Sequence, residues 1–217
     1  MHFTNILTNT PRILWMRSNK KRVESILAAA FIGAIIYGLP LILATTFNLA
    51  TISFCVLVSV FYVVKIGKKN LREVPSLKVF LITIVYFTII FVLPFQSVTR
   101  VNMSLQPVLQ FGIFQYLYIL GITALFDIPD VDYDNKSLKT LPQIFGRRRT
   151  IFISMGLIVP LLVYLLNGGY DKIYTLLLVA IHIPFYYFLL QQRRDHYYLS
   201  FFGEGILGLL GVYYYLI

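Results

Sequence analysis

The chain has 217 residues, of which 58% are hydrophobic and only 13% are charged, and its mean hydropathy is +0.76. Soluble domains are about 45–50% apolar and about 25% charged, so this composition excludes a soluble globular domain and indicates a polytopic membrane protein. The formal net charge is +10. The Lys and Arg residues stand between apolar segments, which is typical of topology signals and not of a nucleic-acid-binding surface. The single cysteine, Cys55, excludes a disulfide framework.

Residues 1–22 are predicted to form a basic cytoplasmic tail. No apolar segment occurs before Val23, so the tail lacks the hydrophobic region of a signal peptide. We expect it to lie on the membrane surface, with Trp15 near the interface. Its basic residues are Arg12, Arg17, Lys20, Lys21 and Arg22.

A transmembrane domain is predicted over residues 23–217. It contains seven apolar segments, and each is close to the roughly 20 residues that cross about 30 Å of hydrocarbon as a helix. The segments are 23–45, 49–66, 78–95, 105–126, 149–166, 172–190 and 200–217. The expected fold is therefore an all-α integral membrane bundle of about seven transmembrane helices. Six or eight helices remain open, because Pro40, Pro160 and Pro184 interrupt the apolar segments.

The basic residues alternate between the connections of these segments. Seventeen of the 19 Lys and Arg residues fall in every second connection, and only Arg100 and Lys172 fall in the others. The positive-inside rule then places the N-terminus and the connection at 127–148 in the cytoplasm and the C-terminus outside. Because the external connections are short, a site is expected to open toward the cytoplasm or laterally into the bilayer.

A cluster of carboxylates follows the apolar segment that ends at Phe126. Four of the nine acidic residues lie within eight positions, as Asp127, Asp130, Asp132 and Asp134. If the helix continues into the cluster, the first, second and fourth of these share one face, whereas Asp132 points away. Three carboxylates on one face repel one another unless a cation binds them, and oxygen ligands suit Mg²⁺ beside a phosphate. A solvated acidic loop is the alternative interpretation.

Pro129 lies inside the cluster, and basic residues surround it. The proline removes one helical hydrogen bond and is expected to kink or end the helix there. The basic residues are suited to bind a diphosphate, although a topology role explains them equally well. They are Lys68, Lys69 and Arg72 in the preceding cytoplasmic connection, and Lys136, Lys139 and Arg147 to Arg149 after the cluster.

The stretch from 126 to 150 resembles the second aspartate-rich motif of the UbiA superfamily of intramembrane prenyltransferases. It reads FDIPDVDYDNKSLKTLPQIFGRRRT. The family pattern is D-x-x-D-x-x-x-D, then a basic residue, Thr-Leu-Pro and a glycine. The matching residues are Asp127, Asp130, Asp134, Lys139, Thr140, Leu141, Pro142 and Gly146. Residues 68–95 are similar to the family's cytoplasmic loop and following helix, and 197–210 (YYLSFFGEGILGLL) to the last helix of short bacterial members.

The resemblance implies a UbiA-like helical bundle around a lipid-accessible cavity in the bacterial inner (cytoplasmic) membrane. It implies a transferase that moves a polyprenyl group from a prenyl diphosphate to an aromatic or lipid acceptor with Mg²⁺. The implied metal ligands are Asp127, Asp130 and Asp134, and the implied catalytic residues are Asp130, Asp134 and Lys139. The implied diphosphate contacts are Lys68, Lys69, Arg72, Lys136 and Lys139. The expected partners are the polyprenyl diphosphate, an acceptor that nothing in the sequence selects, and membrane lipid. Neither a nucleic acid nor an oligomer is indicated.

The chain also departs from the family pattern. It has no counterpart of the family's first helical pair or of the Asn/Asp motif that follows it. Pro129 stands where the family often has Arg, and the spacing from Asp134 to Lys139 is one residue shorter than usual. A second interpretation therefore stays open: a catalytically degenerate membrane protein that binds an isoprenoid lipid or is the partner subunit of a complete prenyltransferase.

Two further polar residues lie inside predicted membrane segments. Glu204 is either a functional carboxylate or an interfacial partner of Arg194. His182 is expected to form a hydrogen bond to a neighbouring helix and not to ligate a metal, because no His or Cys stands near it in the sequence.

Overall fold

The computed structural model describes residues 11–64, 71, 74, 76–94, 105–132, 136–168, 172–190 and 205–206. Within these ranges every regular element is a helix and no strand occurs. The reason is that a chain in hydrocarbon must satisfy its own backbone N–H and C=O groups, which a helix does within one segment. The all-α class predicted from composition is therefore confirmed.

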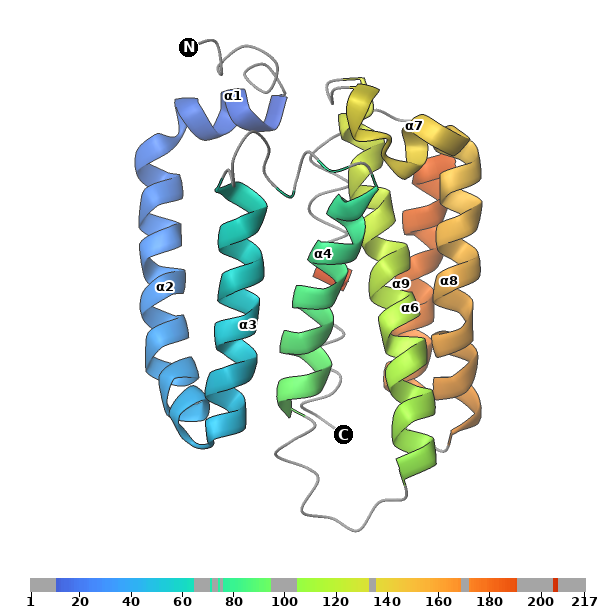
Figure 1. Cartoon of the computed structure of the whole chain (residues 1–217). Coiled ribbons are helices and arrows are strands. Elements are labelled where there is room, and N and C mark those ends of the chain that lie inside the picture. Colours follow the sequence, from blue (N-terminus) through green and yellow to red (C-terminus); the bar gives the residue numbers. More distant parts are fainter. Residues whose placement is uncertain are drawn as a thin grey trace.

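Within the described residues, six main helices and a few short helical turns form the bundle. Consecutive long helices run antiparallel (Figure 1). The elements are α1 (Pro11–Ser18), α2 (Lys20–Leu43), α3 (Thr46–Val63), α4 (Leu77–Phe87), η2 (Thr88–Val92), α6 (Leu105–Asp130), η3 (Lys136–Leu138), α7 (Leu141–Phe145), α8 (Arg147–Asn167) and α9 (Lys172–Leu190). Of these, η2 is a π-helical continuation of α4 and η3 is a single 3₁₀ turn.

Four of the described helices are long and apolar enough to cross a membrane. They are α2, α3, α6 and α8, and two shorter apolar helical stretches occur at Leu77–Val92 and Thr175–Tyr187. The described helices overlap the first six predicted segments. The seventh, 200–217, lies outside the described residues except for Gly205 and Ile206. The helices thus support a membrane protein, whereas the total of seven spans stays a prediction.

Two predicted boundaries differ from the structure. The basic tail is helical from Pro11, and α2 begins at Lys20 instead of Val23. The helix before the acidic cluster continues to Asp130 and not only to Phe126. Pro129 lies in the last turn of this helix, where it cannot donate to the carbonyl oxygen of Leu125, and the helix ends one residue after it, as expected for a proline.

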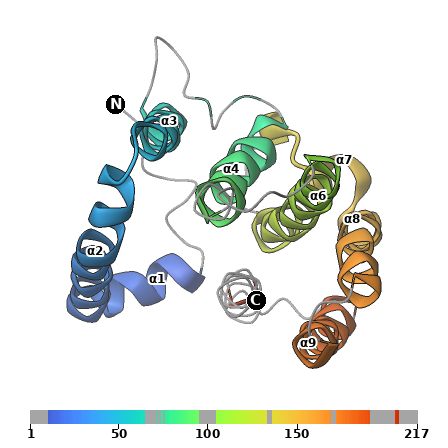
Figure 2. The same cartoon turned by 90° about the horizontal axis from the view of Figure 1, so that it is seen from below.

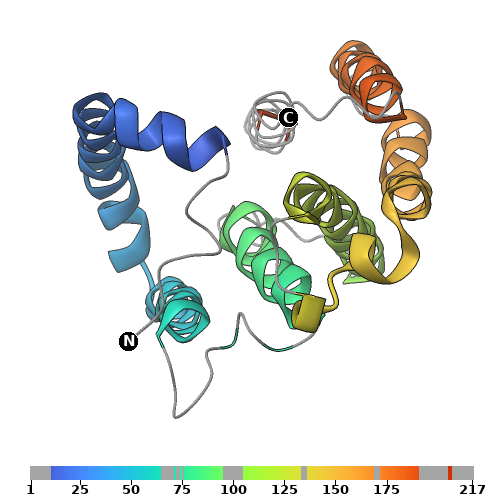
Figure 3. The same cartoon turned by 90° about the horizontal axis from the view of Figure 1, so that it is seen from above.

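Viewed along their axes, the long helices follow one another in chain order along an open curve from α2 to α9 (Figures 2 and 3). The helices along this curve are buried to different extents. None of the apolar membrane-length stretch of α2 is buried, whereas half of that of α6 is. Side chains such as Phe31 on α2 are therefore exposed to the surroundings, which for a membrane helix means lipid.

The hydrophobic core lies among α6, α8 and α9. Gly121 of α6 permits a close approach of α8, because a Cβ at this position would lie 3.0 Å from the carbonyl oxygen of Ser154 on α8. Small residues at a helix contact let two backbones pack tightly where lipid provides no hydrophobic driving force. The core side chains include Tyr118, Ile119, Ile122, Leu125, Ile158, Leu161, Leu165, Leu178, Phe185 and Ile206.

A chain of aromatic rings extends the core toward α4. The ring centroids of Phe87 and Phe91 are 5.1 Å apart, those of Phe91 and Phe111 are 5.7 Å apart, and those of Phe111 and Tyr164 are 5.8 Å apart. These spacings are in the range at which aromatic pairs stabilise a contact beyond the area that they bury. The rings therefore connect α4 and η2 to α6 and α8.

Candidate functional site

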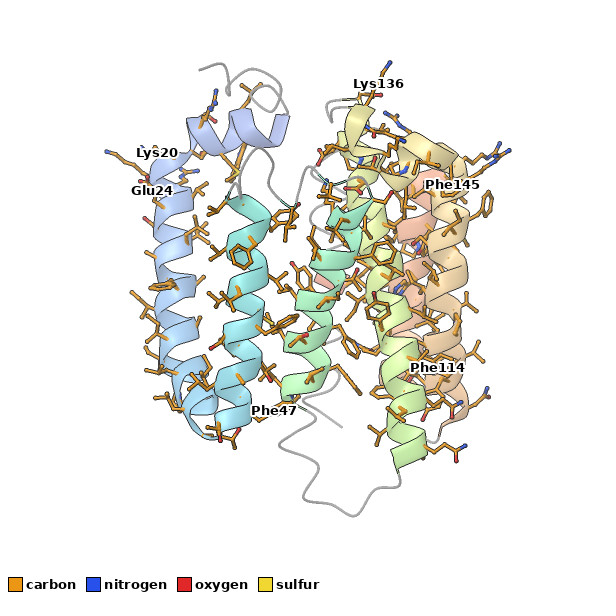
Figure 4. All side chains as sticks on the ribbon, viewed as in Figure 1. Lys20, Glu24, Phe47, Phe114, Lys136 and Phe145 are labelled. Carbon is orange, nitrogen blue, oxygen red and sulfur yellow. The ribbon has the colours of Figure 1, made fainter. Side chains whose placement is uncertain are left out.

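The charged residues of interest gather at one end of the bundle. We call it the basic end and define it by α1, the last turn of α6, η3 and α7, which lie at the same end in Figure 1. Lys20, Glu24 and Lys136 mark this end in Figure 4. The antiparallel course of the helices produces this clustering, as the alternating charges of the connections predicted.

Asp127 is buried at this end and forms an ion pair with Lys78. Its Oδ1 lies 2.5 Å from Lys78 Nζ, and the side chains are 2% and 13% exposed. Lys78 stands in the first turn of α4 and Asp127 in the last turn of α6. An ion pair that is this well buried is held strongly, because removing either partner leaves a charge in a low-dielectric environment. The first predicted metal ligand is therefore engaged by a cation of the chain itself.

A second contact fixes the segment after the acidic cluster against the start of α4. The backbone N–H of Ser76 donates to the carbonyl oxygen of Leu138 at 3.1 Å, and the Ser76 hydroxyl donates to that of Lys139, also at 3.1 Å. Ser76 and Lys139 both have left-handed φ angles, 60° and 47°. Such angles are unfavourable for residues other than glycine, so they persist where surrounding contacts impose them. These two bonds hold Leu138 and Lys139 at the start of α4, two residues before Lys78.

The Thr-Leu-Pro-…-Gly part of the predicted motif builds the short helix α7. The Thr140 N–H donates to Gln143 Oε1 at 3.1 Å, which caps the helix start, and Pro142 is buried in the first turn. Gly146 has a φ of 81°, which turns the chain from α7 into α8. The threonine, proline and glycine of the motif therefore have structural roles in forming α7 and the turn into α8, and these roles require no ligand.

The remaining charges at this end are more exposed. Asp132 pairs with Arg147 at 2.5 Å, with side chains 54% and 30% exposed, so this pair contributes little to stability. Asp130 is partly buried at the end of α6, and Lys136 and Lys139 are exposed. Among the described residues that follow the acidic cluster, the exposed cations are Lys136, Lys139, Arg148 and Arg149.

The predicted site residues are only partly within the described ranges. Asp127 and Asp130 lie on one helix as predicted, and Lys136 and Lys139 lie near its end. Lys68, Lys69, Arg72, Asp134 and Glu204 lie outside the described residues. Within the described ranges, no three His, Cys, Asp or Glu side chains gather closely enough to hold a metal ion. The described part alone thus does not form a three-carboxylate magnesium site, and the metal ligands stay a prediction that depends on Asp134.

Lys78 is the residue at this end that the sequence interpretation missed. It begins the predicted segment 78–95, and the structure places it in the first turn of α4, where it pairs with Asp127. A signal existed, since a lysine at the first turn of an apolar helix needs either water or a carboxylate. Which carboxylate it meets is decided by the packing of α4 on α6.

A buried polar network forms a second cluster of interest, in the middle of the bundle. Tyr118 on α6 and His182 on α9 are 2.9 Å apart, hydroxyl to Nε2, and His182 Nδ1 lies 2.7 Å from the Leu178 carbonyl oxygen. The carbonyl can only accept, so in the neutral imidazole Nδ1 carries the proton and Nε2 accepts from the tyrosine. This confirms the predicted hydrogen bond from His182 to a neighbouring helix.

Ser154 on α8 connects to both α6 and α9. Its hydroxyl donates to the Gly121 carbonyl oxygen at 2.8 Å and lies 2.8 Å from the Tyr186 hydroxyl. Since the serine has one proton, Tyr186 is the donor of the second bond. Sequence reasoning missed Ser154, Tyr118 and Tyr186, because a hydroxyl inside an apolar segment does not show which helix it faces. These buried bonds have the features of hydrogen bonds that hold membrane helices together. Within this network, no nucleophile and base pair faces an open cavity, as a catalytic pair would.

No protein-family model matches the chain, and comparison with curated proteins and with solved structures found no match.

Proposed function

We propose that the protein is a UbiA-like membrane prenyltransferase that transfers a polyprenyl group from a prenyl diphosphate to an aromatic or lipid acceptor. The observation that carries the proposal is the pair of hydrogen bonds that holds Leu138 and Lys139 on Ser76, two residues before the Lys78 that pairs with Asp127 of α6. The motif resemblance of residues 127–146 assigns carboxylates and cations to this same place. The all-helical, apolar body supports a reaction at the membrane.

In the proposal, exposed cations of the basic end bind the diphosphate. Lys136 and Lys139 provide two positive charges, and Lys68, Lys69 and Arg72 are proposed to add to them. Lys139 would assist departure of the diphosphate by stabilising the negative charge that develops on it. Asp130 and Asp134 are the proposed ligands of Mg²⁺, which when bound would neutralise charge on the diphosphate. Asp127 supports them from its buried position beside Lys78.

An apolar groove gives this proposal a place for the isoprenoid chain. It lies between α3 and the helix formed by α4 and η2, and has a volume of about 420 Å³. Its lining includes Tyr62 near the end of α3 and Leu81, Val85 and Ile89 along α4 and η2. Leu81 stands one turn after Lys78, so the groove starts close to the basic end. An apolar wall excludes water, which a carbocation intermediate requires.

The test is metal-dependent binding of a polyprenyl diphosphate to the purified protein in detergent, followed by release of diphosphate in the presence of acceptors. Asp130→Ala/Asp134→Ala is expected to abolish Mg²⁺-dependent binding. The matched control is Glu24→Ala, which removes an exposed carboxylate at the same end of the molecule and is expected to leave binding unchanged. Equal binding by the wild type and the double variant would refute the assignment of these carboxylates.

A specific observation favours a second candidate, a non-catalytic protein that binds an isoprenoid lipid or assists a complete prenyltransferase. Lys78 already neutralises Asp127, one of the three carboxylates of the predicted metal site. A protein of this kind would bind the prenyl ligand and release no diphosphate with any acceptor. Turnover by the isolated chain would exclude it.

A further inference from the structure

The junction of α1 and α2 forms a bend at the basic end, which we call the α1–α2 elbow. α1 lies across the start of α2 instead of continuing its axis (Figures 1 and 3). The carbonyl oxygen of Trp15 accepts from Asn19 N at 2.9 Å, from Asn19 Nδ2 at 3.1 Å and from the Ser18 hydroxyl at 2.9 Å. These bonds satisfy the Trp15 carbonyl in the last turn of α1 and stabilise the bend before α2 begins.

Four cations surround a shallow pocket in this elbow. Six consecutive residues, Arg17 to Arg22, line a space of about 490 Å³, and four of them are Arg17, Lys20, Lys21 and Arg22. The polar side chains of Ser18 and Asn19 complete the lining. Glu24 is the one carboxylate in the sequence of α1 and α2, and it lies 3.7 Å from Lys20 on the exposed surface. The pocket thus has a surplus of positive charge and many hydrogen-bond donors.

Exposed apolar side chains lie on both sides of this pocket along the chain. Leu14, Trp15 and Met16 of α1 are 50%, 46% and 38% exposed. The exposed apolar surface of α2 begins at Ile26, which is 66% exposed, one turn past the cations. A helix with apolar side chains that lies across the end of a membrane helix occupies the interface, where tryptophan is also enriched. The cations then stand at the depth of the lipid phosphates.

We propose that the α1–α2 elbow binds the headgroup phosphate of an anionic phospholipid. The two arginines can each bind phosphate oxygens through two parallel N–H donors, and the lysines add charge. The position of the pocket at the level of the lipid phosphates favours a lipid over a soluble anion. The acyl chains of a bound lipid would lie along the exposed apolar face of α2. Each cation near the bilayer surface contributes about fivefold to the affinity for anionic lipid.

Trp15 makes the proposal directly testable, because it is the single tryptophan of the chain. The full-length protein is reconstituted in phosphatidylcholine vesicles that contain equal mole fractions of either bromine-labelled phosphatidylglycerol or bromine-labelled phosphatidylcholine. Bromine quenches tryptophan fluorescence only at short range. The labelled anionic lipid is expected to quench Trp15 more strongly than the labelled zwitterionic lipid at every mole fraction.

Charge variants then locate the binding site. Arg17→Gln/Lys21→Gln is expected to weaken the preference for the anionic lipid by about 25-fold, from two contributions of about fivefold each. Lys20 is left in place because it pairs with Glu24. The matched control is Arg148→Gln/Arg149→Gln, which removes two exposed cations at the start of α8 and is expected to leave quenching of Trp15 unchanged.

Three results would overturn the proposal. The first is equal quenching by the two labelled lipids, and the second is an equal loss of preference in the control variant, which would indicate general surface charge. The third is reversal of the preference by inorganic phosphate but not by chloride of the same ionic strength, which would indicate a site for a soluble anion. Since no prenyl diphosphate is present, each result is independent of the proposed enzymatic function.

Discussion

The buried ion pair between Lys78 and Asp127 allows the sharpest test of how the basic end is assembled. Replacing Lys78 with methionine keeps most of the apolar side-chain volume but leaves the Asp127 carboxylate, 2% exposed, without this cation. Removing one partner of a buried pair costs about 3–5 kcal/mol, because the remaining charge is not compensated. We expect Lys78→Met to lower the free energy of unfolding by an amount in this range.

The assay is thermal unfolding of the detergent-purified protein, followed by loss of helical circular dichroism. For proteins of 150–250 residues, about 1 kcal/mol shifts the midpoint by about 2–4 °C, so the expected decrease is roughly 6–20 °C. Lys78→Met/Asp127→Leu removes both charges and is expected to recover most of this loss, because an apolar pair of similar volume often replaces a buried ion pair without cost.

The exposed pair of Arg147 and Asp132 is the matched control. Its side chains are 30% and 54% exposed, so Arg147→Gln is expected to cost about 0–1 kcal/mol. A midpoint for Lys78→Met that equals the control would refute the burial argument. A double variant that is no more stable than Lys78→Met would show that the ion pair stabilises the bundle through more than mutual charge compensation.

Three further predictions concern the interior and the α7 turn, all measured as shifts of the same thermal midpoint. Gly121→Val should destabilise by about 1–3 kcal/mol, because its Cβ would press on the Ser154 carbonyl at 3.0 Å; an unchanged midpoint would show that α6 and α8 can separate freely. Tyr118→Phe should cost about 1–3 kcal/mol, and so should His182→Phe, because each leaves the other group buried without the Tyr118–His182 hydrogen bond. The double variant should cost less than the sum of the two; strict additivity would contradict the coupling. Gly146→Ala should cost about 1–2 kcal/mol, because a side chain is unfavourable at a φ of 81°, and a neutral result would mean that the turn relaxes.

The sequence determined the helices and the end at which the charges gather. A backbone in hydrocarbon has no partner but itself, so an apolar segment of sufficient length must be helical wherever it packs. The alternation of basic connections predicted that the N-terminal segment and the acidic cluster lie at one end, and the antiparallel helices place α1 and the end of α6 there (Figure 1). The interhelical role of His182 was predictable for a related reason, since a buried ring nitrogen needs a partner.

The tertiary structure alone decided which helices touch and which residues meet. α2 and α6 are both apolar over a membrane length, yet none of that stretch is buried in α2 and half of it is in α6. Lipid tails are as apolar as leucine, so a hydrophobic pattern does not distinguish a lipid-facing surface from a protein-facing one. The pairing of Lys78 with Asp127 and the clamp of Ser76 on Lys139 follow from the packing of α4 on α6. The sequence thus predicted carboxylates and cations at one end of the bundle. Only the packing of the helices decided that Lys78 pairs with Asp127.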